Sequence, residues 1–597
     1  MALLPTGGGK SICFQVPGLM LNGLCIVITP LISLMRDQVD QLVSRGIKAK
    51  AIYSGMSAKE IDIVLDNCVF GDVKFLYVSP ERLKSNLFLV RAEKMSISMI
   101  AVDEAHCISQ WGYDFRPPYL EIAAFIETCN VKKVVALTAT ATRQVRADIL
   151  DKLGMIDAAV FTETFARPNL SYSVFKLESK EEKLHSILSN VPGSAVVYVR
   201  SRKRTEQIAN WLRNKHFVAD FYHAGLSNQE REKKQDAWMS GKTRIIVATN
   251  AFGMGIDKAD VRVVVHLDLP DTLESYYQEA GRAGRDNKRS YAILLHNDSD
   301  TKGLISRIEK SFIPVDEIKR VYQALSNYYK LAIGSRPDNS FDFQLETFCD
   351  AFNLSVLETH VAISKLQDNG IVQLDDSFKR TSSISFLVEK EALYRFQIAH
   401  PNLEKVIKAL LRLYGGELFT ELVKLRESQL ADFLKVDLKQ VVEWLRALRS
   451  YDIVDYHEIS LKTQLTFLIP RLDPNSLLID RKIYEARKKL ALSKANAVID
   501  YAENTAQCRT RILQKYFDEV SDELCGRCDY CLKKAKGSST EVSASDLSSF
   551  MNVTQFTTID QLERQFPGSN RQKLMSAIRL LVEEGELRVE GDVISKI

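Results

Sequence analysis

Short apolar runs alternate with longer amphipathic segments along the first half of the chain. The runs that we expect to be strands are residues 97–102, 134–137, 195–199, 219–223, 244–249 and 261–266. Helices are expected from Ser11 to Leu19, from Ser201 and from Asn228. Strands that alternate with helices predict a parallel sheet covered on both faces. The chain therefore starts with two α/β lobes, which divide near residues 165–170.

The pattern changes after about residue 301, where a helix that runs into a short strand occurs repeatedly. It is found at residues 364–372 and 447–454, followed by second strands at 384–388 and 465–469, and once more at residues 580–587. Two helices followed by a hairpin form the winged-helix plan. We expect two such units before residue 478 and one at the C-terminus. The inserted pair either binds duplex DNA or serves as a packing scaffold.

A glycine-rich segment precedes the first helix and has the sequence Pro-Thr-Gly-Gly-Gly-Lys-Ser. Consecutive glycines allow backbone N–H groups to point at phosphate oxygens, and the helix N-terminus adds positive potential. Lys10 is expected to reach the β and γ phosphates of ATP, and the Ser11 hydroxyl is expected to bind Mg²⁺. The residues assigned to nucleotide binding are Thr6, Gly7, Gly8, Gly9, Lys10 and Ser11.

Two acidic residues, Asp103 and Glu104, follow the apolar run 97–102. A buried parallel strand delivers such residues to the carboxyl edge of its sheet, where nucleotides bind. Asp103 is expected to hold Mg²⁺, and Glu104 to act as the general base for the attacking water. The hydroxyl-rich loop 138–142 follows the next strand and could couple this site to the second lobe.

An arginine-rich segment, Gln-Glu-Ala-Gly-Arg-Ala-Gly-Arg, ends at Arg285 in the second lobe. When two such lobes face each other, ATP lies between them and the second lobe supplies an arginine to the γ phosphate. Arg285 is the expected arginine finger, Arg282 is expected beside it, and Gln278 is assigned to the nucleotide site. The order and spacing of the three motifs predict an ATP-driven motor.

Four cysteines near the end of the chain have metal-ligand spacing. Cys525, Cys528 and Cys531 form a CxxCxxC pattern, and Cys508 lies upstream. Four thiolates suit a closed, structural Zn²⁺ site without an open position for catalysis. The segment before Cys508 is basic, with charges between residues 481 and 489.

Bulk properties fit this interpretation without deciding it. The chain has 597 residues and a formal net charge of +4, which is too small to indicate nucleic-acid binding by itself. The other six of its ten cysteines are scattered, and neither a secretory signal nor a membrane-spanning run is evident. We therefore expect no disulfides, no membrane association and a cytoplasmic location.

The motifs together resemble the RecQ family of superfamily 2 DNA helicases. The resemblance rests on residues 29–38, 77–83 and 249–258, and above all on residues 107–117, which resemble the aromatic-rich loop that in this family senses single-stranded DNA. Tyr113 stands in that loop where the family usually has histidine. The DNA-contacting residues that the resemblance and the loop chemistry indicate are Thr29, Ser33, Ser79, Arg82, Trp111, Phe115, Arg116, Thr249 and Asn250. Aromatic faces stack on bases, and phosphate contacts carry little sequence information.

The resemblance also implies an architecture and an activity. We expect an α/β fold with two RecA-like lobes at 1–166 and 167–300, the winged-helix-like pair at 301–478, a helical platform with the zinc module at 479–535, and a winged-helix-like unit at 546–597. A polar, flexible linker is expected at 536–545. The implied activity is 3′ to 5′ translocation and DNA unwinding in repair or recombination, by a monomer associated with the bacterial nucleoid and acting on single-stranded and forked DNA.

The sequence begins four residues before Pro5, so we expect either that the true start lies upstream of Met1 or that the chain binds nucleotide poorly. Relatives carry an adenine-recognition segment upstream of this point. The alternative to a helicase is therefore a DNA-binding scaffold in which ATP turnover is impaired.

Overall fold

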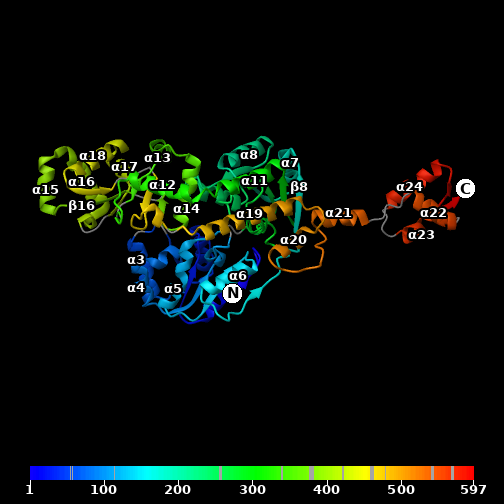
Figure 1. The fold of residues 1–597 in the computed structure, drawn as a ribbon, viewed down its shortest axis with the longest axis horizontal. Coiled ribbons are helices and arrows are strands. Elements are labelled where there is room, and N and C mark those ends of the chain that lie inside the picture. The colour runs from blue at the N-terminus through cyan, green and yellow to red at the C-terminus, as the bar shows by residue number, and fades with distance from the viewer. Residues whose placement is uncertain are drawn as a thin grey trace.

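The computed structural model describes residues 1–597 except 54, 55, 57, 113, 254–257, 336, 338, 339, 376–381, 420–422, 458–462, 478, 539–543, 555 and 567–570. Two α/β lobes lie one above the other in Figure 1, the first in blue and the second in green. The long helix α19 (Arg481–Glu503) runs between them. The inserted units between lobe 2 and α19 lie at one end of the molecule. The C-terminal unit lies at the other end, beyond α21 (Asp529–Ser538).

Lobe 1 is built on a parallel sheet of seven strands in the order β3-β4-β2-β5-β6-β1-β7. Its middle strands are apolar and buried on both faces because helices cover both sides of the sheet. The strands are β1 (Ala2–Leu3), β2 (Leu24–Ile28), β3 (Ala49–Ile52), β4 (Phe75–Val78), β5 (Ile97–Val102), β6 (Val134–Thr138) and β7 (Phe161–Thr162). The helices are α1 (Ile12–Met20), α2 (Ile32–Ser44), α3 (Ala58–Phe70), α4 (Asn86–Ala92), α5 (Glu121–Thr128) and α6 (Arg143–Lys152).

Lobe 2 repeats this plan with six parallel strands in the order β10-β11-β9-β12-β13-β8. The strands are β8 (Leu170–Lys176), β9 (Ser194–Tyr198), β10 (Ala219–Tyr222), β11 (Ile245–Ala248), β12 (Val261–His266) and β13 (Ser290–His296). The helices are α7 (Lys180–Asn190), α8 (Arg202–Asn214), α9 (Asn228–Met239) and α10 (Leu273–Ala280), and α11 (Asp298–Lys310) follows the last strand. Every strand and helix start predicted for the two lobes agrees with these bounds within one or two residues.

The two inserted units are nested rather than consecutive. Strand β15 (Val372–Asp375) pairs with β19 (Gln464–Phe467), whereas β16 (Ser382–Phe386) pairs with β17 (Val423–Leu425) and β18 (Val454–His457). The pairing expected from strand order, 372 with 384–388, is therefore wrong. Each unit has its own buried apolar cluster, so burial of two separate cores decides which strands pair.

Helices complete both of these units. The outer unit contains α12 (Val315–Tyr328), β14 (Phe341–Asp342), α13 (Leu345–Phe352) and α14 (Val356–Asp368). The nested unit contains α15 (Lys390–Ala399), α16 (Pro401–Tyr414), α17 (Glu427–Leu434) and α18 (Leu438–Ser450).

The C-terminal part differs from the prediction at the linker. Helix α21 continues through Ser538, so residues 536–538 are helical, and α22 (Ala544–Thr554) begins before the expected domain start. The middle of the predicted linker lies outside the described residues. The last unit contains α23 (Ile559–Gln565), α24 (Arg571–Glu583), β20 (Phe556–Thr558), β21 (Leu587–Glu590) and β22 (Val593–Lys596). Its hairpin turns at Gly591, which has a φ of +65°.

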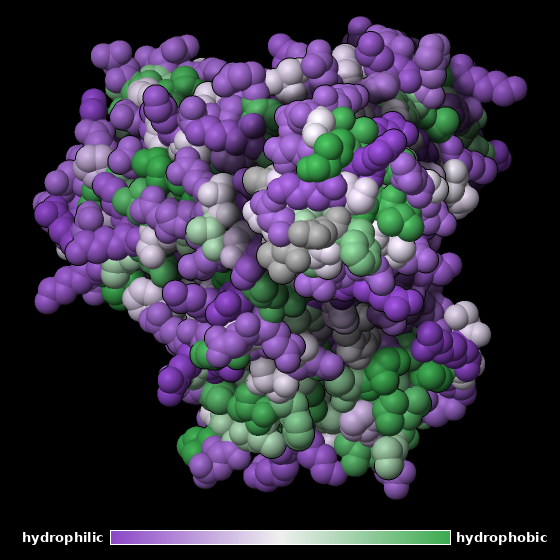
Figure 2. Space-filling model, turned by 90° about the vertical axis from the view of Figure 1, so that its right-hand side faces the viewer, coloured by the Kyte–Doolittle hydropathy of each residue, from purple (hydrophilic) through white to green (hydrophobic). Residues whose placement is uncertain are grey.

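One buried cluster joins both lobes to the zinc-module helices α19 and α20 (Arg509–Tyr516). Val498, Tyr501 and Phe517 belong to the same cluster as Ile100 of lobe 1 and Tyr276 of lobe 2. Figure 2 shows a mostly hydrophilic surface, with hydrophobic side chains gathered at the lower end of that view. Within the described part of the chain, no helix has the length and apolar character needed to cross a bilayer.

Candidate functional site

The glycine-rich segment forms a tight loop between β1 and α1. Gly7 and Gly9 have φ angles of +84° and +78°, which residues with side chains rarely adopt. The Gly8 amide donates to the Pro5 carbonyl at 2.9 Å, which closes the turn. The hydroxyl oxygen of Thr6 is buried and makes no hydrogen bond to the described residues. A loop of this shape, with an unpaired polar atom, fits the phosphates of a nucleotide.

The two acids stand where the sequence places them, immediately after β5. Glu104 adopts a left-handed φ of 46°, and its carboxylate lies 3.7 Å from Lys10 Nζ and 3.3 Å from His106 Nδ1. Burial opposes ionisation of Glu104, but Lys10 and His106 outweigh it and lower its pKa to about 2. Burial, together with the Glu104 charge, raises the pKa of Asp103 to about 6. A divalent cation would favour the charged form of Asp103, so this donor fits Mg²⁺.

The arginine-rich segment of lobe 2 lies against the glycine-rich loop of lobe 1. A Cβ atom added at Gly7 would be 3.0 Å from Arg285 Cγ, and one added at Gly281 would be 2.9 Å from Thr6 Cβ. Arg282 is 4% exposed, and its Nε and Nη1 atoms have no hydrogen-bond partner among the described residues. Gln278 is also buried, in α10. The fold therefore brings Gly281 and Arg285 of lobe 2 against the glycine-rich loop of lobe 1, and Arg282 carries two unused guanidinium donors suited to an anion.

Arg167, which lies in the segment between the lobes, is a site residue that sequence reasoning missed. Its guanidinium donates to the Thr6 carbonyl at 2.7 Å and to the Gly284 carbonyl at 3.1 Å, with longer bonds to Gly281 and Ala283. Asn169 adds a bond of 2.6 Å to Gly284. Arg167 thereby ties the phosphate loop to the arginine segment. No motif surrounds it, so only its place beside the lobe boundary could have drawn attention to it.

The acids are connected to the hydroxyl-rich loop through His106. Its Nδ1 lies 2.9 Å from Thr138 Oγ1, at the end of β6. This contact joins the acids to the loop 138–142 within lobe 1, and the coupling of the loop to the second lobe stays a prediction.

The aromatic-rich loop lies beside the acids and beneath α19. The Trp111 amide donates to Ser109 Oγ at 3.2 Å, and Arg116 binds Asp114 and the Pro30 carbonyl. The Arg487 guanidinium lies 5.4 Å from the centre of the Phe115 ring. Trp111, Phe115 and Arg116 are all partly exposed, as a nucleic-acid contact requires, whereas Tyr113 lies outside the described residues.

The remaining predicted DNA contacts lie at the carboxyl ends of strands in both lobes. Thr29 follows β2 and is fully buried, whereas Ser79 and Arg82, which follow β4, are partly exposed. Thr249 follows β11 and is buried, and Asn250 beside it is exposed. The side chain of Ser33 lies outside the described residues. Because buried hydroxyls cannot reach a ligand without a shift, Asn250 and Arg82 are the more accessible members of this set.

The four cysteines converge as their spacing predicts. Their Sγ atoms all lie within 4.8 Å of one another, with pairs at 3.8 and 3.9 Å. The amides of Cys528 and Cys531 point at the sulfurs of Cys525 and Cys528, at 3.4 Å in each case. Four sulfurs at this separation fit a tetrahedral Zn²⁺ ion.

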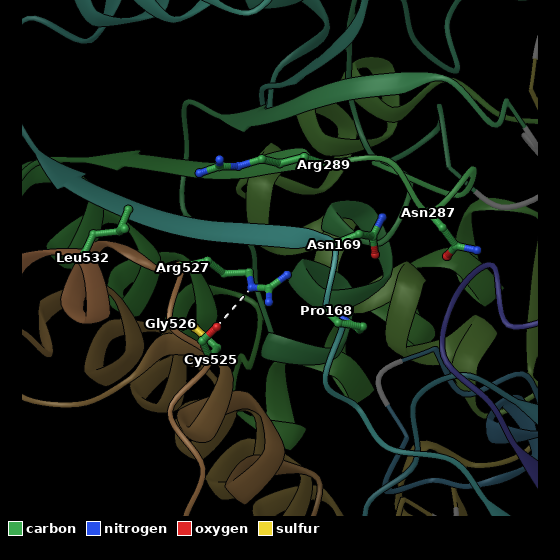
Figure 3. Close-up of a pocket in the computed structure, with 8 residues that line it drawn as sticks. All are labelled: Pro168, Asn169, Asn287, Arg289, Cys525, Gly526, Arg527 and Leu532. Carbon is green, nitrogen blue, oxygen red and sulfur yellow. Dashed lines mark hydrogen bonds between the residues drawn. The ribbon is translucent and has the colours of Figure 1, made fainter. Parts of the chain in front are cut away.

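The zinc loop is packed against lobe 2. The Arg527 carbonyl accepts from Ser171 at 2.6 Å, and Asp529 accepts from the Val174 amide at 3.0 Å and from Arg509. A cavity of about 650 Å³ lies at this junction. Figure 3 shows the residues that line it. It is lined by Pro168, Asn169, Asn287, Arg289, Cys525, Gly526, Arg527 and Leu532. The loop that carries the cysteine cluster thus contacts β8 of lobe 2 directly.

The zinc module also holds the boundary between the lobes. The Glu519 carboxylate accepts from the Phe165 amide at 2.7 Å, and the Phe517 ring stacks on Phe165 at 4.3 Å. Residues that lie between the first cysteine and the other three therefore contact the segment that joins the two lobes.

Comparisons with known protein families agree with this geometry. The model described as "DEAD/DEAH box helicase" matches residues 1–148, and "Helicase conserved C-terminal domain" matches residues 179–287. Two further models are specific: "RecQ helicase winged-helix domain, Bacteroidota" matches residues 384–458, and "RecQ zinc-binding" matches residues 473–532. This chain belongs to the RecQ family of helicases.

Curated relatives of this RecQ-family chain include "ATP-dependent DNA helicase RecQ" of Pasteurella multocida, 44% identical over 50% of this chain and 48% of the relative. The Bacillus subtilis protein of the same name is 42% identical over 54% of this chain and 55% of the relative. "Probable ATP-dependent DNA helicase RecS" of Bacillus subtilis is 40% identical over 54% of this chain and 66% of the relative. The chain spans about half the length of the first two.

Solved structures include the Mycobacterium smegmatis helicase Lhr bound to ssDNA and AMP-PNP. The match covers 60% of this RecQ-family chain and 51% of the Lhr chain, with 17% sequence identity and a TM-score of 0.41. The winged-helix match covers the nested unit, so a winged-helix domain occurs in the predicted region, although its strands pair differently from the prediction.

Proposed function

We propose that this chain is an ATP-dependent DNA helicase that uses ATP hydrolysis to move 3′ to 5′ on single-stranded DNA and to unwind duplexes, in repair or recombination. The observation that carries the proposal is the close contact between Arg285 and Gly7, because a lobe 2 arginine there lies directly beside the glycine-rich loop of lobe 1. Such an arginine can add about a thousandfold or more to the rate of phosphoryl transfer.

Lys10, Ser11 and Asp103 would hold the nucleotide and its metal ion. Mg²⁺, when bound, neutralises charge on the phosphates and orients them. Lys10 has two roles, since its ammonium lies 3.7 Å from Glu104 and is also the group that reaches phosphate. When Lys10 turns to the phosphates, Glu104 loses the positive charge that depresses its pKa and becomes a stronger base.

The hydrolytic step would then depend on three side chains. Glu104 accepts a proton from the attacking water, while His106 keeps the carboxylate oriented through its contacts to Glu104 and Thr138. Arg282 and Arg285 stabilise the charge that develops on the γ phosphate. The buried, unfilled donors of Arg282 support this assignment.

DNA would lie across the carboxyl ends of the strands in both lobes. Arg82 and Asn250 would bind its phosphates, and Trp111 and Phe115 would stack on bases. Because these contacts read little sequence, we expect selectivity for DNA structure and binding that weakens with salt. The resemblance to the RecQ family supports the 3′ to 5′ direction.

Steady-state ATP hydrolysis with and without single-stranded DNA tests the proposal. Wild-type turnover should rise with DNA, Lys10→Ala should abolish it, and Lys132→Ala, at an exposed lobe 1 position, should match the wild type. Retained DNA binding with no hydrolysis in the wild type would contradict the motor and support the scaffold alternative.

Further assays address the finer assignments. Unwinding of partial duplexes with a 3′ or a 5′ overhang measures the direction of translocation. Unwinding only from the 5′ overhang would contradict the proposed 3′ to 5′ direction. We also propose a monomer located with the bacterial nucleoid. Light scattering of the purified chain tests the monomer, and fluorescence microscopy of a tagged chain tests the location.

A further inference from the structure

A buried lysine of the zinc platform touches both lobes at once. Lys494, in the middle of α19, is 8% exposed. Its ammonium donates to the Trp111 carbonyl of the aromatic-rich loop at 2.9 Å and forms an ion pair with Glu274 of lobe 2 at 3.0 Å. One cation thus joins three parts of the molecule that are more than 160 residues apart in sequence.

Glu274 is 3% exposed and is held on both oxygens. Lys494 approaches Oε1, and the Tyr516 hydroxyl donates to Oε2 at 2.7 Å. Glu274 is the second residue of α10, and Gln278 lies one turn further along the same helix. Arg282 and Arg285 follow directly after α10, so a shift of the Glu274 end would move the arginine segment at the other end.

A second contact of α19 with the aromatic-rich loop lies two turns earlier. Arg487 is seven residues before Lys494, which places both on the same side of the helix, and its guanidinium faces the Phe115 ring. Helix α19 therefore touches the loop at Trp111 and at Phe115. A base that stacks on Phe115 must displace Arg487 or slide beneath it.

A buried ammonium is strongly destabilising unless it keeps its partners. The Trp111 carbonyl and the Glu274 carboxylate therefore move together with Lys494, or both contacts of its ammonium are lost. Rigid elements joined by such a contact pass a displacement at one end to the other.

We propose that Lys494 is a positioning residue that couples DNA contact at the aromatic-rich loop to the placement of Arg282 and Arg285 in the ATP cleft. The inference deepens the proposed function and rests on it. DNA that displaces the loop moves Trp111, Lys494 transmits the displacement to Glu274, and α10 turns the arginine segment toward the phosphates.

The test compares Lys494→Met, Lys494→Arg and Glu274→Gln with Lys489→Met, an exposed lysine of the same helix. In Lys494→Met, turnover at saturating single-stranded DNA should fall by about 5- to 150-fold, the usual range of coupling between two sites. The KM for ATP without DNA should change little, Lys494→Arg should restore part of the loss, and Lys489→Met should match the wild type. Unchanged DNA-stimulated turnover in folded Lys494→Met would overturn the proposal.

Glu274→Gln keeps the inference testable if Lys494→Met does not fold, because it preserves the shape of the side chain. The double variant should lose no more stimulation than either single variant, since both remove the same contact. Additive losses, or wild-type stimulation in Glu274→Gln, would count against the coupling.

Amide hydrogen exchange at residues 273–280 separates this inference from the proposed function. DNA should change exchange there in the wild type and not in Lys494→Met, whether or not ATP is hydrolysed. If exchange responds but no ATP is hydrolysed, the helicase proposal fails and the coupling stands. If wild-type exchange at these residues ignores bound DNA, or if no DNA binds, the coupling is wrong.

Discussion

Replacement of Arg167 by alanine should open the ATP cleft without unfolding either lobe. The side chain is partly exposed and lies between the lobes, where it donates to carbonyls of the phosphate loop and of the arginine segment. Its loss leaves the contact between Gly7 and Arg285 without the bond that fixes their separation. The main effect should therefore fall on the rate of hydrolysis.

The size of the effect follows from the two short bonds, to Thr6 at 2.7 Å and to Gly284 at 3.1 Å. A hydrogen bond to a charged donor contributes about 1.5–3 kcal/mol. Because the side chain is partly exposed, we take half of that free energy for each bond to allow for solvent screening. The two bonds together then contribute about 1.5–3 kcal/mol. If the whole loss falls on the transition state, kcat decreases by about 10- to 150-fold.

Steady-state ATP hydrolysis at saturating DNA measures this change. Arg167→Lys keeps the charge but not the planar fork of donors, so it should fall between the wild type and Arg167→Ala. Arg45→Ala, at an exposed position of lobe 1, serves as the control. The reasoning is refuted if folded Arg167→Ala keeps a kcat within about threefold of the wild type, because its bonds would then not set the cleft geometry.

Three further changes have expected outcomes. Glu104→Gln should lower kcat by about 10²- to 10⁴-fold with ATP binding retained, which single-turnover and nucleotide-binding measurements would separate; a near-normal rate would exclude this base. Cys528→Ser should reduce zinc content and the melting temperature, because a structural zinc site adds folding free energy, and calorimetry with metal analysis would detect it; unchanged values would argue against a metal site. Replacement of residues 376–463 by a two-residue Asn-Gly turn should leave the outer unit folded, because Asp375 and Gln464 are paired across neighbouring strands. Amide hydrogen exchange across β15 should then stay slow. Fast exchange there would contradict the nested topology.

Local sequence signals predicted the two α/β lobes closely. Strands such as 97–102 are apolar because both faces are covered, so their bounds follow from composition alone. The phosphate loop needs glycine at Gly7 and Gly9 for backbone conformation, and the cysteine spacing brings four sulfurs together with little help from distant residues. These features depend on neighbours within about one turn or one strand, which the sequence displays directly.

The inserted units show where such signals fail. The helix-to-strand repeat at 364–372 and 447–454 was visible, but its strands pair across the chain rather than with the next strand. Strand pairing depends on which apolar faces share a core, and two similar repeats offer both choices. Separate burial around Leu465 and around Ile384 decides between them.

The sequence by itself determined two parallel-sheet lobes, the glycine-rich loop before the first long helix, the cysteine cluster and the family. Only the tertiary structure decided that Arg167 joins the phosphate loop to the arginine segment and that Lys494 joins Trp111 to Glu274. Neither residue lies in a motif, because its role depends on partners more than 100 residues away. Motifs record chemistry that neighbouring residues perform together, whereas contacts between domains exist only once the chain has folded.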